Sequence, residues 1–298
     1  MISSLSYLPS SGDWQDIAWN GHVFCAIKYN SDKAATSADG ITWIERTLPV
    51  STTWRSIAWN GVVFCAVSGS SNIAATSPDG ITWTQQVLPV YSPQGIAAKE
   101  TLFCASPMNS PVMLSTDGAT WTTASKPDST CNDIISTGDI FCSIGVYSAV
   151  SNAAGTSWTH GTMPNGTNWS RVAWNGSVFC ALSNYNLWSI CALSSNGVSW
   201  TSSTLPSSAK WAGIAWNGSV FCAVAENGTV TATSPDGITW TSHTMPASAD
   251  WHNIIWNGRI FCAITSSSDL VATSLDGTWQ DYEVPFWTNF KGQTEIIK

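Results

Sequence analysis

The chain has 298 residues, of which 10% are charged, and its formal net charge is −8 at pH 7. This acidic balance, without any run of Lys or Arg, disfavours nucleic acid as a partner, because nucleic-acid-binding proteins carry basic patches. A hydrophobic content of 44% with so little charge favours a packed core over disorder. Residues 1–10 lack a basic start and an apolar core, and no apolar run approaches about eighteen residues. We therefore expect neither a secretory signal peptide nor insertion into a membrane.

A Phe-Cys pair recurs seven times from the N-terminus to the C-terminus, at intervals of 38 to 42 residues. The paired cysteines are Cys25, Cys65, Cys104, Cys142, Cys180, Cys222 and Cys262. A fixed period near forty residues is the signature of a repeat architecture. The repeats start near residues 13, 53, 93, 131, 168, 210 and 250. We predict one domain over residues 1–285 and a C-terminal tail over 286–298.

Residues 6–14 precede the first repeat and resemble the junctions that link later repeats. They predict a leading outer strand that helps to close the ring. Each repeat then holds four short apolar runs, which in the second repeat are 56–59, 62–67, 73–76 and 81–88. Asn60-Gly61 joins the first two runs and Asp79-Gly80 the last two, and both dipeptides favour tight hairpins. Four antiparallel strands per repeat predict an all-β, seven-bladed β-propeller.

The last hairpin carries a resemblance to a known family. Residues 36–43, 76–83 and 233–240 read TSADGITW, TSPDGITW and TSPDGITW. They are similar to the Asp-box of BNR-type propellers, S-x-D-x-G-x-T-W, with one residue fewer between Asp and Gly. The resemblance implies a propeller fold. It leaves the activity open, because such boxes occur in sialidases, lectins and bacteriophage tail proteins.

Seven of the nine cysteines occupy one equivalent strand position, one in each blade. Equivalent positions of neighbouring blades should lie about 10 Å apart, beyond the ~7 Å limit for a disulfide. We therefore predict free, buried thiols at these positions, and also at Cys131 and Cys191. Free thiols favour assembly in a reducing cytoplasm. No Cys/His spacing indicates a metal site, and no cofactor is expected.

Tryptophan is abundant, with 19 residues in the chain. Five of them open the innermost strand of a blade: Trp14, Trp54, Trp169, Trp211 and Trp251. They either plug the seam between blades or form exposed platforms for sugar rings. Trp188 and Tyr185 lie together in a loop and are further candidates for exposure. These seven residues are the predicted glycan-binding set. The tryptophans of the box and of the Trp-Asn-Gly turns are expected to pack within the fold.

The two rims of the propeller differ in sequence. The rim with the Asn-Gly and Asp-Gly turns is nearly the same in every repeat, and we call it the uniform rim. The opposite rim holds the linkers between blades and the loops between second and third strands, which differ in every repeat. We call it the variable rim. Variable loops on a rigid scaffold commonly carry function, so any binding site is expected there.

Catalysis finds little support in the sequence. A sialidase needs a cluster of arginines, yet the chain has only Arg46, Arg55, Arg171 and Arg259. Of these, only Arg55 and Arg171 are expected to face the variable rim. A glycoside hydrolase needs two nearby carboxylates, and Asp13, Asp16, Asp133 and Asp250 lie near the starts of innermost strands. The histidines lack the spacing of metal ligands or of a catalytic triad. We predict that the protein is not an enzyme and has no catalytic residues.

The sequence thus predicts a recognition module that binds cell-surface glycans through its variable rim. The box resemblance favours a bacteriophage tail or another virion-associated adhesin. One alternative is a purely structural virion or scaffold component that contacts other subunits through the tail at 286–298. A glycoside hydrolase is the less favoured alternative.

Overall fold

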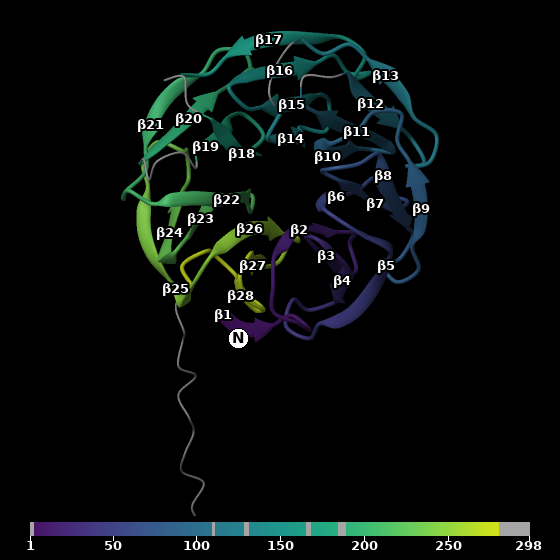
Figure 1. The fold of residues 1–298 in the computed structure, drawn as a ribbon. Coiled ribbons are helices and arrows are strands. Elements are labelled where there is room, and N and C mark those ends of the chain that lie inside the picture. The colour runs from purple at the N-terminus through teal and green to yellow at the C-terminus, as the bar shows by residue number, and fades with distance from the viewer. Residues whose placement is uncertain (1–2, 109–110, 128–130, 165–167, 184–188, 280–298) are drawn as a thin grey trace, which may run out of the picture.

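The computed structural model describes residues 3–108, 111–127, 131–164, 168–183 and 189–279. Over these residues the chain forms seven four-stranded antiparallel sheets, arranged as blades around a central axis (Figure 1). The predicted all-β, seven-bladed propeller is confirmed. No helix in the described part of the chain is long and apolar enough to cross a membrane.

Each blade contributes one strand to each of four concentric positions. The innermost strands are β2 (Trp14–Trp19), β6 (Trp54–Trp59), β10 (Pro93–Lys99), β14 (Asp133–Ser136), β18 (Trp169–Trp174), β22 (Lys210–Trp216) and β26 (Trp251–Trp256). The second strands are β3 (Phe24–Lys28), β7 (Phe64–Ser68), β11 (Leu102–Pro107), β15 (Phe141–Ile144), β19 (Phe179–Ser183), β23 (Phe221–Glu226) and β27 (Phe261–Thr265). The third strands are β4 (Ser31–Ser37), β8 (Ile73–Ser77), β12 (Val112–Ser115), β16 (Tyr147–Ser151), β20 (Ile190–Ser194), β24 (Gly228–Ser234) and β28 (Leu270–Ser274). The outer strands are β5 (Ile44–Thr52), β9 (Thr84–Val87), β13 (Thr122–Ala124), β17 (Trp158–Thr162), β21 (Thr201–Thr204), β25 (Thr241–Ala249) and β1 (Ser3–Tyr7).

The ring closes through the N-terminal strand. β1 pairs antiparallel with β28, in a register that sets Ser3 opposite Ser274 and Tyr7 opposite Leu270. The last blade therefore combines three strands from the end of the repeat array with one from its start (Figure 1). Leu8 follows β1, is 3% exposed, and packs in the seam against Trp14. The predicted role of the N-terminal segment in closing the ring is confirmed.

Alternation along each second strand gives a blade two apolar faces. In β3, Phe24 and Ala26 pack toward the preceding blade, whereas Cys25 and Ile27 pack toward the following one. This period of two is what a strand buried on both sides requires. All nine cysteines are free and buried, as predicted. Burial raises the pKa of the Cys25 thiol, so this side chain is a small apolar core residue.

The box residues close the outer hairpin at the uniform rim. Asp79 Oδ1 accepts hydrogen bonds from the backbone N–H groups of Ile81 (2.8 Å) and Thr82 (3.1 Å). Ser77 Oγ accepts one from Gly80 N–H at 2.8 Å, and Gly80 has φ = +76°, a conformation that favours glycine. Trp83 Nε1 donates to the Gly80 carbonyl at 3.0 Å. The predicted role of the box aspartates, which is to bond their own turns, is confirmed.

Candidate functional site at the channel mouth

The five tryptophans that open innermost strands are all fully buried: Trp14, Trp54, Trp169, Trp211 and Trp251. Each ring fills the seam against the preceding blade, and the indole N–H of Trp54, for example, donates to the Val50 carbonyl at 3.2 Å. A buried ring offers no face to a sugar, so the expectation of exposed stacking platforms is corrected at these five positions. Their repeated place in the sequence reflects the repeated seam. Tyr185 and Trp188 lie outside the described residues.

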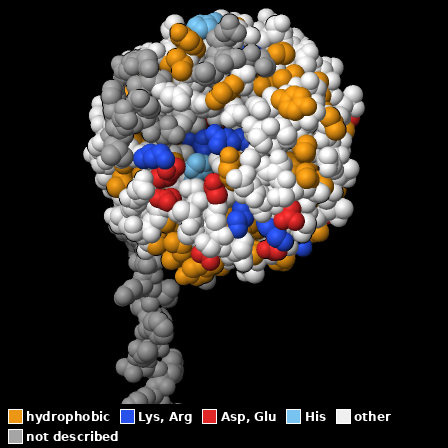
Figure 2. All heavy atoms as spheres, in the orientation of Figure 1, with side chains coloured by type: hydrophobic (Ala, Val, Ile, Leu, Met, Phe, Trp, Pro, Cys, Tyr) orange, Lys and Arg blue, Asp and Glu red, His pale blue; other side chains and the backbone are white. Residues whose placement is uncertain are grey.

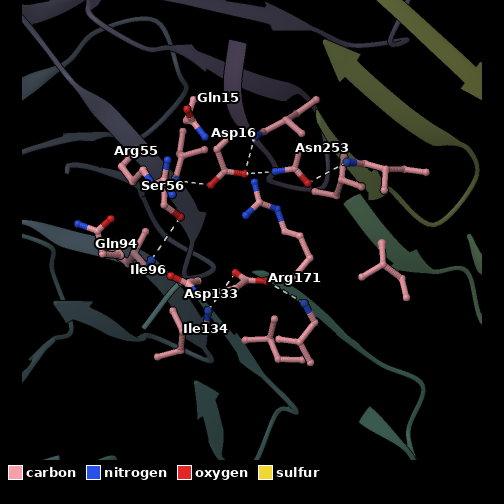
Figure 3. Close-up of a pocket in the computed structure, with 18 residues that line it drawn as sticks. Gln15, Asp16, Arg55, Ser56, Gln94, Ile96, Asp133, Ile134, Arg171 and Asn253 are labelled. Atoms are coloured by element: carbon pink, nitrogen blue, oxygen red, sulfur yellow. Dashed lines mark hydrogen bonds between the residues drawn. The ribbon is translucent and has the colours of Figure 1, made fainter. Parts of the chain in front are cut away.

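Two adjoining polar cavities lie where the innermost strands begin. The first, of about 190 Å³, is lined by residues from the innermost strands of all seven blades or next to them, among them Asp16, Arg55, Asp133, Arg171 and Asn253 (Figure 3). The second, of about 250 Å³, shares Arg55, Asn132 and Arg171 with the first. We call the two together the channel mouth. Figure 2, which looks onto the variable rim, shows charged side chains and a histidine gathered around its hollow centre.

β-Bulges aim polar side chains into the mouth. The register between the first and second strands shifts by one residue just after the start of six innermost strands, for example between Trp54 and Ser56. The extra residues are Gln15, Arg55, Gln94, Ser170, Ala212 and His252. All six line one of the two cavities. Bulges redirect side chains in this way at many functional sites.

Two aspartates at the mouth join neighbouring blades. Asp16 Oδ2 accepts a hydrogen bond from Ile57 N–H of the next blade at 2.8 Å, and Asn253 of the last blade donates to its Oδ1 at 2.7 Å. Asp133 Oδ2 likewise accepts from Val172 N–H of the next blade at 2.9 Å. Each carboxylate also accepts the N–H of the residue that follows it. Both carboxylates therefore link blades around the channel.

Burial raises the pKa of both linking aspartates. For Asp133 the pKa rises to about 6, although the Arg171 guanidinium and the Val172 N–H oppose the rise. For Asp16 burial also outweighs the hydrogen bonds that favour the charged form. The loss of hydration thus exceeds the gain from partners at both positions. At pH 7 Asp133 remains mostly ionised.

A second group of polar side chains forms a chain of contacts from Lys210 to Arg171. Glu226 accepts hydrogen bonds from Lys210 and, at 3.1 Å, from His252 Nδ1. Burial raises the pKa of Glu226, but these two partners outweigh it and lower the pKa to about 2. His252 Nε2 faces a guanidinium nitrogen of Arg171 at 3.0 Å and the Gln15 amide nitrogen at 2.9 Å.

These contacts fix the protonation of His252. Arg171 has only donors to offer, so His252 Nε2 accepts and the proton lies on Nδ1, toward Glu226. Burial lowers the pKa of His252, which agrees with a neutral ring. The Nε2 lone pair accepts hydrogen bonds within the chain, and this arrangement positions the Arg171 guanidinium.

The two arginines of the mouth lack ionic partners. No carboxylate lies within 4.0 Å of either guanidinium among the described residues, where the ion pairs are Lys33–Glu45, Lys210–Glu226 and His252–Glu226. Arg171 Nε is buried and has no hydrogen-bond partner there. The described residues also contain no group of three or more His, Cys, Asp or Glu side chains that could hold a metal ion.

The sequence located these residues only in part. Arg55 and Arg171 were expected at the variable rim, and Asp16 and Asp133 were noted near strand starts, but none was selected as a binding residue. His252 and Glu226 were missed. One available signal is the position directly after the repeated Trp, which changes from repeat to repeat as Gln15, Arg55, Ser170, Ala212 and His252. Variation at one position of a regular repeat marks the place where the blades differ in role.

No protein-family model matches the sequence, and no curated protein matches it. Many solved structures match its fold, and two kinds of propeller are among them. YCF48 bound to D1 peptide has 14% identity and a TM-score of 0.74, over 92% of this chain and 97% of that chain. Virginiamycin B lyase from Staphylococcus aureus, in a catalytically inactive form with quinupristin, has 12% identity and a TM-score of 0.78, over 91% and 98%. YCF48 from Cyanidioschyzon merolae has 11% identity and a TM-score of 0.72, over 92% and 98%. At these identities the likeness is one of fold.

Proposed function

We propose that this protein is a non-catalytic recognition module that holds a protein segment on its variable rim, over the channel mouth. One observation carries the proposal. The carboxylates of Asp16, Asp133 and Glu226 and the His252 ring are engaged by the chain itself, whereas Arg55 and part of Arg171 are left without partners. Such a site offers hydrogen-bond donors to a ligand but no free acid or base pair.

Two further features support a polypeptide ligand. Tyr91, in a linker between blades, is 65% exposed, and Tyr147, which follows a loop of the variable rim, is 45% exposed. Tyrosine supplies contact area and a polar tip at little cost in conformational entropy, which suits recognition of a polypeptide. One propeller of similar fold, YCF48, has a structure bound to D1 peptide.

A surface glycan is the second candidate ligand. The box resemblance to lectins and bacteriophage tail proteins favours it, as does the low charge of the chain. In that case the protein would act as a virion-associated adhesin, and exposed tyrosines such as Tyr91 would stack on sugar rings in place of the buried tryptophans.

The test is an array that carries both peptides and surface glycans, probed with the purified protein. We expect the wild-type protein to bind peptides in a saturable way. The double variant Tyr91→Ala, Tyr147→Ala should bind the same peptides more weakly. The matched control is Ile81→Ala, a 49% exposed residue of the uniform rim, which should bind as wild type does. Binding to glycans alone would favour the adhesin. Binding that the control weakens and the tyrosine variant does not would contradict the assignment to the variable rim.

A further inference from the structure

Arg55 and Arg171 place two guanidinium groups in one cavity without an ionic partner for either. Arg55 makes no hydrogen bond to the described residues. Burial lowers its pKa most and the like charge of Arg171 lowers it further, and the opposing effects of Tyr29, Asp16 and Asp133 do not offset the two. Two cations that repel each other in a partly desolvated cavity cost stability unless an anion joins them.

The nearby carboxylates do not satisfy these cations. Asp16 and Asp133 direct their oxygens at backbone N–H groups of their own and the following blades, at 2.8 to 2.9 Å. Both lie farther than 4.0 Å from any guanidinium nitrogen, so their role is to join blades. Figure 3 shows Arg171 reaching across the cavity between these two aspartates.

The Arg171 guanidinium and the stem of Arg55 are positioned before any ligand arrives. Arg171 is fixed by His252 Nε2 at 3.0 Å and by the Ser170 carbonyl at 3.0 Å, while its Nε–H is buried without a partner. The stem of Arg55 lies against Gly69, where an added Cβ would stand 3.1 Å from the Arg55 Cβ. The absence of a side chain at Gly69 therefore leaves room for the aliphatic part of the Arg55 side chain. A guanidinium held in this way matches the two oxygens of a planar anion.

The surroundings favour a singly charged anion. Asp13, Asp16 and Asp133 lie close enough to act electrostatically on these cations or on each other, and they would repel a doubly charged phosphate more than a carboxylate. One residue further along the strands, seven aliphatic side chains lie beneath the same cavity and are buried: Ile17, Ile57, Ile96, Ile134, Val172, Ile214 and Ile254. The choice of a polypeptide carboxylate over that of a sugar acid therefore rests on the exposed tyrosines of the variable rim.

We propose that Arg55 and Arg171 form a binding site for one carboxylate group of a polypeptide partner. The inference rests on the proposed function, because it names the group by which the partner is anchored. The carboxylate comes from the end of the partner chain or from an Asp or Glu side chain. Its oxygens accept hydrogen bonds from the Arg55 guanidinium and from the terminal N–H groups of Arg171 that Ser170 and His252 leave free, and the carboxylate offsets part of the buried positive charge.

The chain has four arginines, which makes the test specific. In protein labelled with ¹⁵N at arginine Nε, each Nε–H gives its own NMR signal. We expect N-acetylvaline to shift the signals of Arg55 and Arg171 in a saturable way. The signals of Arg46, on an outer strand, and Arg259, at the uniform rim, serve as internal controls. N-acetylvalinamide, which lacks the carboxylate, should shift none of the four.

Further probes separate the possible sources of the anion. The α-amide of N-acetylaspartic acid, with only a side-chain carboxylate, tests that source against the terminal carboxylate of N-acetylvaline. Tighter binding of glucuronate than of either would overturn the polypeptide assignment, and an equal response to inorganic phosphate or chloride would overturn the carboxylate site. No shift at about 50 mM of every carboxylate probe would also overturn it.

Variants keep the result independent of folding. Arg55→Gln removes a guanidinium that has no hydrogen bond in the described structure, so it should leave the fold intact and weaken N-acetylvaline binding about tenfold. Arg259→Gln should leave binding unchanged. If the tyrosine variant abolishes peptide capture while no carboxylate moves the arginine signals, the proposed function stands and this inference fails. If the carboxylate binds but peptide capture ignores the variable rim, the proposed function fails.

Discussion

The seams between blades and the channel mouth lie one residue apart in the chain but obey different rules. Trp54 is fully buried in a seam, and its indole N–H has a partner. Arg55, the next residue, lines the mouth and has no hydrogen bond among the described residues. Seams repeat because every blade must bury the same faces, whereas the mouth varies because it contributes little to that packing. Changes in the seam should therefore affect stability, and changes at the mouth should affect binding.

The strongest test of the seam is Trp54→Ala. Removal of a fully buried indole should lower the free energy of unfolding by about 3–5 kcal/mol, from lost burial and the cavity that remains. Urea unfolding followed by circular dichroism measures the change. Val62→Ala, at a 58% exposed position of the uniform rim, is the control and should change stability by less than about 0.5 kcal/mol. Similar losses in the two variants would contradict the seam assignment.

Ring closure is tested by Leu8→Ala. Leu8 is 3% exposed and packs against Trp14 where the two ends of the propeller meet, so its truncation should cost about 2–4 kcal/mol. Leu5, on β1 just before Leu8, is 38% exposed, and Leu5→Ala should cost clearly less. Thermal unfolding of the two variants gives the comparison. Equal stabilities would show that the N-terminal segment does not carry the closure.

The buried carboxylate of Asp133 should make the free energy of unfolding fall as the pH rises. An ion-paired aspartate, whose pKa is lowered in the folded state, would have the opposite effect. Its pKa is raised to about 6 in the folded state, so between about pH 4 and 6 the folded state binds more protons than the unfolded state. The free energy of unfolding should therefore fall as the pH rises through this window, by up to about 2 kcal/mol from this group. Denaturation of wild type and Asp133→Asn at several pH values isolates the contribution. An unchanged pH profile in the variant would refute it.

Changes in the box turns should also lower the free energy of unfolding, but by less than changes in the seams. Ser77 Oγ accepts the Gly80 N–H and donates to Asp79, and the side chain is fully buried. Ser77→Ala leaves that buried N–H without its acceptor and should cost about 1 kcal/mol in urea unfolding. Ser71, a half-buried loop residue of the same blade, is the control position for serine truncation. A larger loss at Ser71 would argue against a special role for the box serine.

The smallest effect on stability is expected at the mouth itself. Arg55→Gln removes a charge that is buried in part and repelled by Arg171, so the free energy of unfolding should change by less than about 0.5 kcal/mol or rise slightly. Ligand binding should fall in the same variant. A marked loss of stability would show that Arg55 is a structural residue and would remove the contrast between seam and mouth.

The sequence by itself determined the architecture. A Phe-Cys pair every forty residues, with Asn-Gly and Asp-Gly turns at fixed offsets, predicts seven four-stranded blades because each feature reports a local constraint on the backbone. The role of the box aspartates followed from the same local reasoning, and the free cysteines followed from the distance between equivalent positions of neighbouring blades. Residues 6–14 were expected to form a leading strand that helps to close the ring, because they resemble other junctions, and the strand that does so is Ser3–Tyr7.

Only the tertiary structure decided what the tryptophans and the polar residues do. The choice between seam and exposed platform for Trp14 or Trp54 depends on how closely the neighbouring blade approaches, and no pattern within one repeat contains that distance. The meeting of Arg55 and Arg171 likewise joins repeats two and five, which are 116 residues apart in the chain. A closed ring brings the starts of all innermost strands to one axis, so residues that look scattered in the sequence form one site.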